Sequence, residues 1–390
     1  MKKKTIGKEY IFTALILFVV LAVTMVLDSQ LPSYHIVIKV IKKASVYSLV
    51  AVSMNLLNGF TGLFSLGQAG FMLLGAYSYA VLCIPVAKRA GVYQYFDGGI
   101  VKFSLPEVFA SFLGDKVGSA VGMILALLVG GLIAAFFAYL IGLPVLRLKS
   151  DYLAIATLGF AEIMRTIIQW NAIGPLTNAS NLLKGYPDFS SATAYLLLIG
   201  VFIACVVLLV NSTYGRAFKA IRDDEIAAGA SGLNTTYLKV LVFAISAFFA
   251  GIAGGIFAQY IGSLNPAMAG WLQSINYVIM VVFGGMGSLT GSIVSAIALT
   301  ILPELLRAFS TYRMLVYSVA LVLIMIFRPQ GIFGNWEFSL TKTINKLFYP
   351  MKVKAHGKSK QAESTAKAAK DTAKTDETVE TAADTKEAQA

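Results

Sequence analysis

The stretch "GSAVGMILALLVGGLIAAFFAYLIGL", residues 118–143, contains no charged residue. A helix of this length rises about 1.5 Å per residue and exceeds the roughly 30 Å hydrocarbon core of a bilayer. Similar apolar runs recur along the 390-residue chain, which is 57% hydrophobic and 13% charged and has a mean hydropathy of +0.74. Soluble domains have about 45–50% apolar and about 25% charged residues. The sequence therefore predicts an all-α integral membrane protein.

The apolar runs predict about ten transmembrane helices, with a range of roughly 8–11. The first run, residues 11–27, is longer than the roughly 7–15-residue core of a signal peptide and lacks a small-x-small cleavage site, so we expect it to be retained. An even count places both termini on one side, and the basic residues on that side indicate the cytoplasm. The other expected spans are 44–63, 68–86, 118–143, 153–170, 194–211, 239–260, 273–289, 290–306 and 314–327.

Residues typical of catalytic and metal sites are not arranged as such sites require. Cys83 and Cys205 lie in apolar runs, and His35 and His356 lack metal-ligand spacing. The chain has no P-loop motif, and no nucleophile–base arrangement stands out. We therefore expect no enzyme activity, no metal site and no cofactor held by this chain.

The net charge of +12 is carried by residues 1–354, because the tail at 355–390 is close to neutral. A positive excess in a membrane protein suits anionic lipid head groups rather than nucleic acid. The tail has almost no large apolar residue and cannot bury enough surface to offset the entropy of ordering. The sequence thus predicts a membrane domain at 1–354 and a disordered polar cytoplasmic tail at 355–390.

Glycines and polar residues interrupt two of the apolar stretches, "NLLNGFTGLFSLGQAGFMLLGAYSY" (55–79) and "VVFGGMGSLTGS" (281–292). Small residues permit close helix packing. Alternatively, broken helices expose backbone groups that line a substrate pathway, and paired breaks are typical of transporters. Both interpretations remain open. The candidate pathway residues are Asn55, Asn58, Gly59, Thr61, Gly62, Ser65, Gln68, Gly284, Gly285 and Gly287.

Charged residues also occur within predicted spans. Glu162 and Arg165 are three residues apart and can pair on one helix face, and Glu304 and Arg307 repeat this spacing. An unpaired charge near the bilayer centre costs about 2.5–3.5 kcal/mol, so these side chains should face the protein interior or a wet cavity. A structural ion pair and a gating or translocation role both remain open.

One segment between two apolar runs is strongly charged: "GRAFKAIRDDEIAAGASGL", residues 215–233. Its six charges would cost roughly 20 kcal/mol in hydrocarbon, so it lies outside the membrane core. Residues 216–228 favour a helix, and Gly229 and Gly232 offer a turn or helix end. The residues alone fit equally a helix lying on lipid head groups and a docking element for a soluble partner.

This segment resembles the cytoplasmic coupling loop of ABC importer permeases, in which Glu-Ala-Ala is followed, after three intervening residues, by Gly. Ala227, Ala228 and Gly232 match that signature, whereas Ile226 occupies the position of the Glu and Glu225 lies one residue earlier. The resemblance assigns the contact with the ATPase to Arg216, Lys219, Arg222, Glu225, Ala227, Ala228 and Gly232.

The resemblance extends over residues 44–335 to branched-chain amino-acid permeases of the LivM type. An outer segment, residues 87–117, has no typical counterpart there and could modify docking of an external protein. The stretches that resemble the family, in its order, are "NLLNGFTGLFSLGQAGFMLLGAY", "GLPVLRLKSDYLAIATLGFAEIMR", "SAFFAGIAGGIFA", "VVFGGMGSLTGS", "LPELLR" and "FRPQGIFG".

Membership of this family implies a permease subunit in the bacterial cytoplasmic membrane that imports leucine, isoleucine and valine. It implies a second homologous permease, two cytoplasmic subunits that bind ATP, and an extracytoplasmic binding protein that delivers the substrate. Transport of urea or short amides is an alternative within related permeases. An ion-gradient-driven secondary transporter and a structural membrane scaffold are alternatives of other classes.

Overall fold

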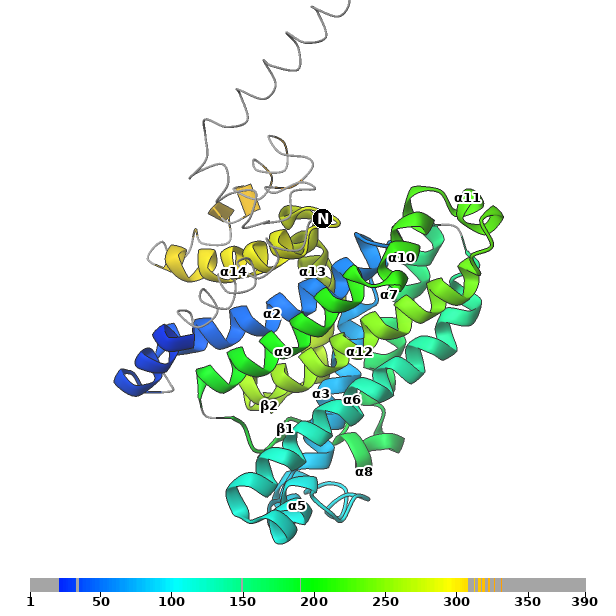
Figure 1. The fold of residues 1–390 in the computed structure, drawn as a ribbon. Coiled ribbons are helices and arrows are strands. Elements are labelled where there is room, and N and C mark those ends of the chain that lie inside the picture. Colours follow the sequence, from blue (N-terminus) through cyan, green and yellow to red (C-terminus); the bar gives the residue numbers. More distant parts are fainter. Residues whose placement is uncertain are drawn as a thin grey trace, which may run out of the picture. The chain divides into compact units, whose positions relative to one another are not determined.

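The computed structural model describes residues 21–32, 35–148, 150–189 and 191–307 and eight further residues up to Gly331 (Figure 1). All belong to one compact unit, Phe18–Glu337. Of the first predicted span, 11–27, the structure describes residues 21–27, which belong to a helix that continues to residue 30. The predicted tail at 355–390 and most of the predicted span at 314–327 lie outside the described residues.

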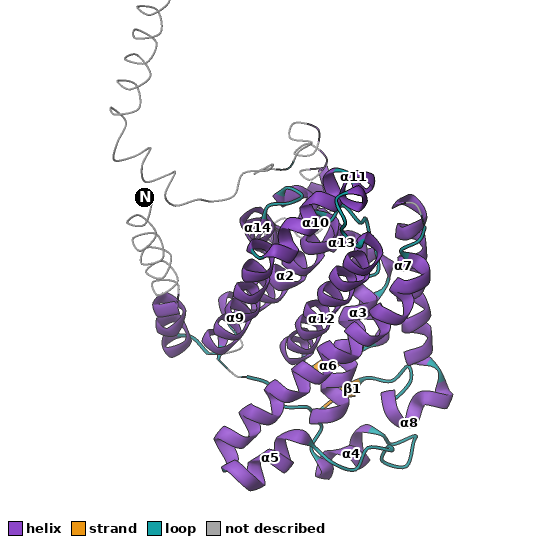
Figure 2. Ribbon diagram, turned by 45° about the vertical axis from the view of Figure 1, so that its right-hand side comes forward, coloured by secondary structure: helices purple, strands orange, loops and turns teal. Residues whose placement is uncertain are grey.

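Helices make up most of the described chain (Figure 2). The longer ones are α2 (Ile36–Asn58), α3 (Gln68–Cys83), α6 (Asp115–Val145), α7 (Ser150–Gln169), α9 (Ala192–Asn211), α12 (Thr235–Ile261), α13 (Trp271–Gly284) and α14 (Leu289–Leu305). The shorter ones are α4 (Val86–Val92), α5 (Leu105–Leu113), α8 (Gly174–Thr177), α10 (Thr213–Asp223), α11 (Glu225–Ala230), and the 3₁₀ helices η1 (Asn171–Ile173) and η2 (Pro266–Ala269).

The prediction of an entirely α-helical chain needs one small correction. Strands β1 (Leu183–Lys184) and β2 (Ser263–Leu264) form an antiparallel pair in which Leu183 lies opposite Leu264. This pairing satisfies backbone groups where the chain leaves the helices on either side. It joins the segment before α9 to the end of α12.

Within the described part of the chain, three helices, α6, α9 and α12, are long and apolar enough to cross a bilayer, and α3 with α4 forms a fourth candidate that is bent by 120°. Several predicted boundaries were wrong. Helix α2 begins at Ile36 rather than at residue 44, and α13 ends at Gly284 rather than at residue 289. The span predicted at 44–63 ends at Asn58, because the backbone from Gly59 to Gly67 leaves the helix, and the span predicted at 68–86 ends at Cys83, just before Pro85. The count of about ten spans stays a prediction.

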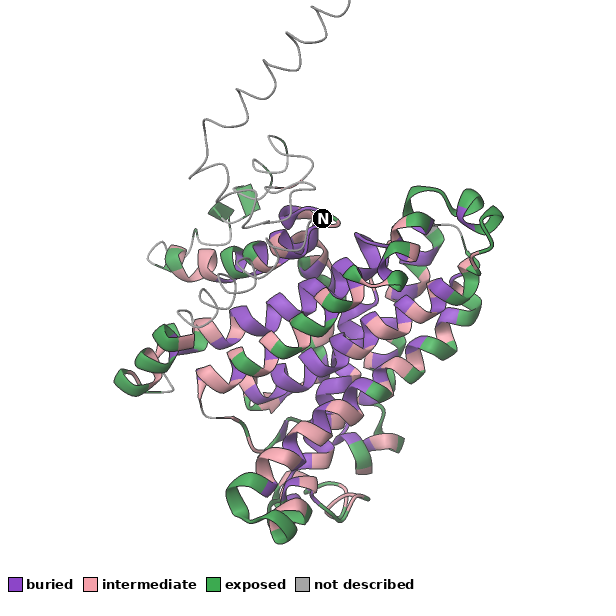
Figure 3. Ribbon diagram, viewed as in Figure 1, coloured by how far each residue is buried: buried purple, intermediate pink, exposed green. Residues whose placement is uncertain are grey.

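Helix α12 lies at the centre of the bundle, between α2 and α9 on one side and α3 and α6 on the other (Figures 1 and 2). In an 18-residue apolar stretch of α12, 72% of the residues are buried, whereas the corresponding shares in α6 and α9 are 33% and 22% (Figure 3). The outward residues of α6 and α9, such as Phe136 and Leu208, are exposed and apolar. A central α12 with apolar outer helices is the arrangement expected for a bundle surrounded by lipid.

The contact between α3 and α12 depends on glycines that let the two backbones touch. A Cβ added at Gly75 would lie 1.9 Å from the carbonyl oxygen of Gly251, and a Cβ at Gly254 would lie 1.9 Å from that of Met72. No side chain fits at either position. Close packing, one of the two interpretations of the glycine-rich stretch 55–79, therefore applies at its Gly75 end.

We expect Gly75→Val to destabilise the protein by about 3 kcal/mol, because the added side chain forces α3 away from α12. The measurement is the thermal unfolding temperature of the purified protein in mild detergent. Gly200→Val in α9 is the matched control, since a Cβ there meets nothing within 4 Å. Equal unfolding temperatures for the two variants would contradict the close contact.

Candidate functional site

The charged segment forms two helices, α10 and α11, which lie at the end of the bundle opposite α5 and α8 (Figures 1 and 2). We call residues 213–230 the coupling segment. The single helix predicted over 216–228 was wrong, because Asp224 adopts an extended backbone (φ −158°, ψ 111°) between the two. Its carboxylate accepts hydrogen bonds from the backbone nitrogens of Ile226 and Ala227, at 2.8 and 3.0 Å, and so begins a new helix.

Helix α10 is anchored to the bundle by its apolar side. Phe218 and Ile221 are buried, and the ammonium of Lys219 lies 5.3 Å from the centre of the Phe60 ring. This distance fits a cation–π interaction. Phe60 belongs to the non-helical stretch that follows α2, so α10 packs directly on the first glycine-rich break.

Arg222 connects α10 to both glycine-rich breaks. Its Nη1 donates a hydrogen bond to the carbonyl oxygen of Gly59 at 3.3 Å, and its Nε and Nη2 bind the carboxylate of Asp223. A Cβ at Gly62 would lie 3.0 Å from the Arg222 Cγ, and one at Gly287 would lie 3.2 Å from Nη1. The guanidinium therefore occupies the space between the break after α2 and the break between α13 and α14.

Asn55 joins the same two breaks from inside the bundle. Its Oδ1 accepts a hydrogen bond from the backbone nitrogen of Gly287 at 2.9 Å, and its Nδ2 donates to the Ser288 carbonyl and the Ser292 hydroxyl, both at 2.8 Å. The end of α2 approaches this loop so closely that a Cβ at Gly59 would lie 2.3 Å from the Gly287 nitrogen. We call Asn55, Gly59, Gly62, Gly287 and Arg222 the glycine junction.

The other polar residues predicted for the pathway are buried and hydrogen-bonded within the protein. Asn58 exchanges hydrogen bonds with the backbone of Ser65, and Thr61 donates to the carbonyl of Leu56. The Gln68 amide nitrogen donates to the hydroxyls of Ser53 and Ser246, at 3.0 and 3.2 Å. In this conformation these groups stabilise the breaks. A role in the pathway stays a prediction for them and for Gly284 and Gly285, which are also buried.

Helix α11 presents its surface outward. Ile226 is 85% exposed, Ala227 and Gly229 are exposed, and only Ala228 is buried. Glu225 pairs with Lys239 at the start of α12. Gly232 ends the helix with a φ of +87° in open space, as the sequence predicted.

The structure thus separates the residues assigned to ATPase contact into two groups. Lys219 and Ala228 face the bundle, and Arg222 contacts it at Gly59 although its side chain is 36% exposed. Arg216, Glu225, Ala227 and Gly232 are exposed. Sequence reasoning missed Ile226 as a surface residue and Asp224 as the joint between the helices. The pattern Asp224-Glu225 before a short alanine-rich run is a helix-start signal that identifies the joint in retrospect.

The two predicted charge pairs differ. Arg165 Nε binds Glu162 Oε2 at 2.7 Å, as the spacing predicted, and Glu162 Oε1 also accepts from the backbone nitrogen of Trp271 at 3.0 Å. Glu304 and Arg307 form no ion pair with any described residue. Helix α14 ends at Leu305, so Arg307 no longer follows the helical spacing that would place it over Glu304.

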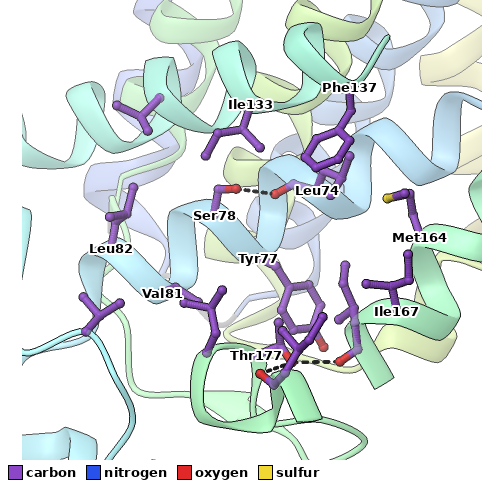
Figure 4. A pocket seen from close by; sticks show the side chains of 15 residues that line it. Leu74, Tyr77, Ser78, Val81, Leu82, Ile133, Phe137, Met164, Ile167 and Thr177 are labelled. Atoms are coloured by element: carbon purple, nitrogen blue, oxygen red, sulfur yellow. Dashed lines mark hydrogen bonds between the residues drawn. The ribbon is translucent and has the colours of Figure 1, made fainter. Parts of the chain in front are cut away.

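An apolar cavity of about 400 Å³ lies between α3, α6, α7 and α8 (Figure 4). Its lining includes Ile133, Phe137 and Ile167, and the hydroxyls of Ser78 and Thr177 are already bonded to backbone carbonyls. Such a surface suits an apolar group rather than an amino acid's charged ends. Among the described residues, no group of three or more His, Cys, Asp or Glu side chains could hold a metal ion.

Residues 36–327 match the family model described as "Branched-chain amino acid transport system / permease component". The chain belongs to this family. It is therefore the permease component of a branched-chain amino acid transport system rather than an enzyme, and the family is one of multi-pass membrane proteins whose partner subunits handle ATP.

Curated relatives agree with this assignment. The chain is 32% identical over 321 residues to the Salmonella typhimurium high-affinity branched-chain amino acid transport system permease protein LivM, covering 74% of this chain and 67% of the relative. It is 24% identical over 307 residues to Escherichia coli LivH, a match that covers 75% of this chain and 92% of LivH. It is 26% identical over 325 residues to the Escherichia coli ribose import permease protein RbsC, a match that covers 80% of this chain and 90% of RbsC. No solved structure matches the chain.

We expect Asn55→Leu to destabilise the permease by about 3 kcal/mol, because it leaves the buried Gly287 nitrogen and Ser288 carbonyl without their partner. Thermal unfolding in mild detergent measures the loss. The control is Asn276→Leu on α13, an exposed asparagine. If both variants unfold at the wild-type temperature, the glycine junction does not depend on Asn55.

Proposed function

We propose that the coupling segment receives an ATP-binding subunit on its exposed α11 surface and transmits that subunit's movement to the glycine junction. The observation that carries this proposal is the position of Arg222, on the coupling segment and in contact with both glycine-rich breaks. One side chain thereby links a cytoplasmic surface to two interrupted membrane helices.

The complete transporter in this proposal has a second, homologous permease subunit, two cytoplasmic ATP-binding subunits and an extracytoplasmic binding protein. Each permease contributes about ten spans and places both termini in the cytoplasm of a bacterial cell. The existence of both LivM and LivH among the relatives supports a pair of unlike permeases. Both relatives are named as branched-chain amino acid permeases, which supports leucine, isoleucine and valine as the substrates of this chain.

The docking surface on α11 is small and partly apolar. Ile226 is 85% exposed and stands beside the small residue Ala227, so a partner can approach the helix backbone closely. An exposed large aliphatic side chain outside the membrane is stabilised when a protein groove covers it. Glu225 is held by Lys239, which fixes the direction in which α11 points.

The movement then passes through α10 to the breaks. Phe218 and Ile221 hold α10 against the bundle, so displacement of α11 turns α10 about this buried side. Arg222 lies at the end of α10 and its guanidinium moves with it, shifting the loop at Gly59 and the neighbouring Gly287. Because Asn55 bonds to the same loop, the ends of α2, α13 and α14 move together, which gives alternating access to the pathway.

The outer segment lies at the other end of the bundle (Figure 1). Arg89 is buried there and donates hydrogen bonds to the carbonyls of Val81, Val101 and Phe103, at 2.8, 2.6 and 2.7 Å. These contacts hold α4 and α5 in a fixed arrangement. We include this segment, residues 87–117, in the surface that meets the extracytoplasmic binding protein.

Ile226→Asp should release the ATP-binding subunit that docks on this chain, because it places a charge in an apolar contact. The affinity-tagged permease is purified from native membranes in mild detergent, and its partners are identified by mass spectrometry. Wild type should bring a second permease and two ATP-binding subunits, whereas Ile226→Asp should bring the second permease and only about half as much ATP-binding subunit. Ile226→Leu serves as the control and keeps all partners. Recovery of the wild-type chain without any ATP-binding subunit would refute the proposed assembly.

Arg222→Gln should give a different defect, since this side chain binds the Gly59 carbonyl of the bundle and lies on α10 rather than on the α11 surface. We expect the ATP-binding subunits to stay bound and hydrolyse ATP, while uptake in proteoliposomes falls about tenfold. The expected loss corresponds to removal of a charge-assisted hydrogen bond that connects two moving parts. Arg216→Gln removes a positive charge from the outward side of the same helix. Its uptake shows whether loss of any positive charge on α10 is enough to lower transport. Equal uptake by Arg222→Gln and wild type would contradict transmission through Arg222.

A further inference from the structure

The outer faces of the long helices are not alike. On α6, the exposed large residues include Leu132, Phe136 and Leu140, and on α9 they include Leu197 and Leu208. Apolar side chains such as these are well solvated by the hydrocarbon chains of lipids.

Helix α7 differs, because an ion pair lies at the edge of its exposed face. The side chains of Arg165 and Glu162 are 28% and 30% exposed. Ile155 and Ile163 are exposed on the same helix, and Trp170 is exposed just after its end. Charged side chains in a membrane domain face a wet cavity or another protein, because contact with hydrocarbon is strongly unfavourable. The edge of α7 that carries the pair is therefore unsuited to contact with the hydrocarbon core of the bilayer.

Glu162 has a structural role that fully accounts for its position. One oxygen accepts the backbone N–H of Trp271, the first residue of α13, and the other accepts Arg165 Nε. A carboxylate at a helix N-terminus is favoured by the partial positive charge of the helix end. Glu162 thus fixes the start of α13 against α7 and orients the guanidinium of Arg165.

Only one of the three guanidinium nitrogens of Arg165 takes part in this arrangement. Its Nε holds Glu162, while its two terminal nitrogens make no hydrogen bond to any described residue. A planar guanidinium presents these donors as a fork whose geometry matches the two oxygens of a carboxylate. The orientation set by Glu162 leaves that fork available on a partly exposed edge.

We propose, on the basis of the transport function above, that Arg165 binds the carboxylate of the amino-acid substrate on the wall of the translocation pathway. This wall consists of the Arg165 edge of α7 and the N-terminal end of α13. Trp271 and Leu272, which are 52% and 61% exposed, supply an apolar surface next to the ion pair for a branched aliphatic side chain. The ion pair has no net charge, which suits a zwitterion better than an organic anion.

The test measures leucine transported per ATP hydrolysed by the whole transporter in proteoliposomes, with leucine-loaded binding protein at saturation. Arg165→Gln removes the fork and should lower this ratio at least fivefold, while ATPase stimulation by the binding protein stays within twofold of wild type. Arg165→Lys keeps the pair with Glu162 but has only one nitrogen, and should give an intermediate ratio. Arg147→Gln, an exposed arginine just after α6, is the control and should leave the ratio unchanged.

The outcomes separate this proposal from simpler roles. An unchanged leucine-to-ATP ratio in Arg165→Gln overturns it. Equal loss of assembly in Arg165→Gln, Arg165→Lys and Glu162→Gln also overturns it, and assigns the pair to the attachment of α13 alone. If the wild-type complex shows no ATP-driven uptake of leucine, the proposed function fails first, which is a different result from failure at Arg165.

Discussion

In a bilayer, each backbone group that a broken helix releases must find a partner inside the protein, since hydrocarbon offers none. The break after α2 satisfies this constraint with side chains from several elements. Asn58 pairs with the backbone of Ser65, Thr157 of α7 accepts from the Leu66 nitrogen, and Arg222 binds the Gly59 carbonyl. The polar residues that interrupt the apolar stretch are therefore those that make the interruption stable.

The same constraint explains why structure and function meet at these breaks. A regular helix provides hydrogen-bond partners for its own backbone N–H and C=O groups, so it needs none from distant side chains. A broken helix depends on partners in other elements, and Asn55 and Arg222 are such partners for the breaks after α2 and between α13 and α14. Movement of a partner then changes the energy of the break itself. This dependence makes the glycine junction a suitable receiver for movement that begins outside the membrane.

The sequence predicted the membrane class and the positions of α6, α9 and α12 within a few residues, because their apolar runs are long and uninterrupted. It also predicted the pairing of Glu162 with Arg165, a local contact within one helix. It could not predict that Arg222 reaches Gly59, 163 residues away, since tertiary contacts leave no local pattern. The missing pair at Glu304 and Arg307 has a local cause, the end of α14, and helix ends are the least certain part of any sequence-based assignment.

Asp224 has a mechanical consequence for the coupling segment. Its backbone N–H closes α10 on Ala220, and its carbonyl accepts the nitrogen of Ala228, while its side chain caps α11. One residue is thus a structural member of both helices, and its backbone torsions are restrained from both sides. Because both helices restrain Asp224, we expect a displacement of α11 at Ile226 to be transmitted to Arg222 at the end of α10.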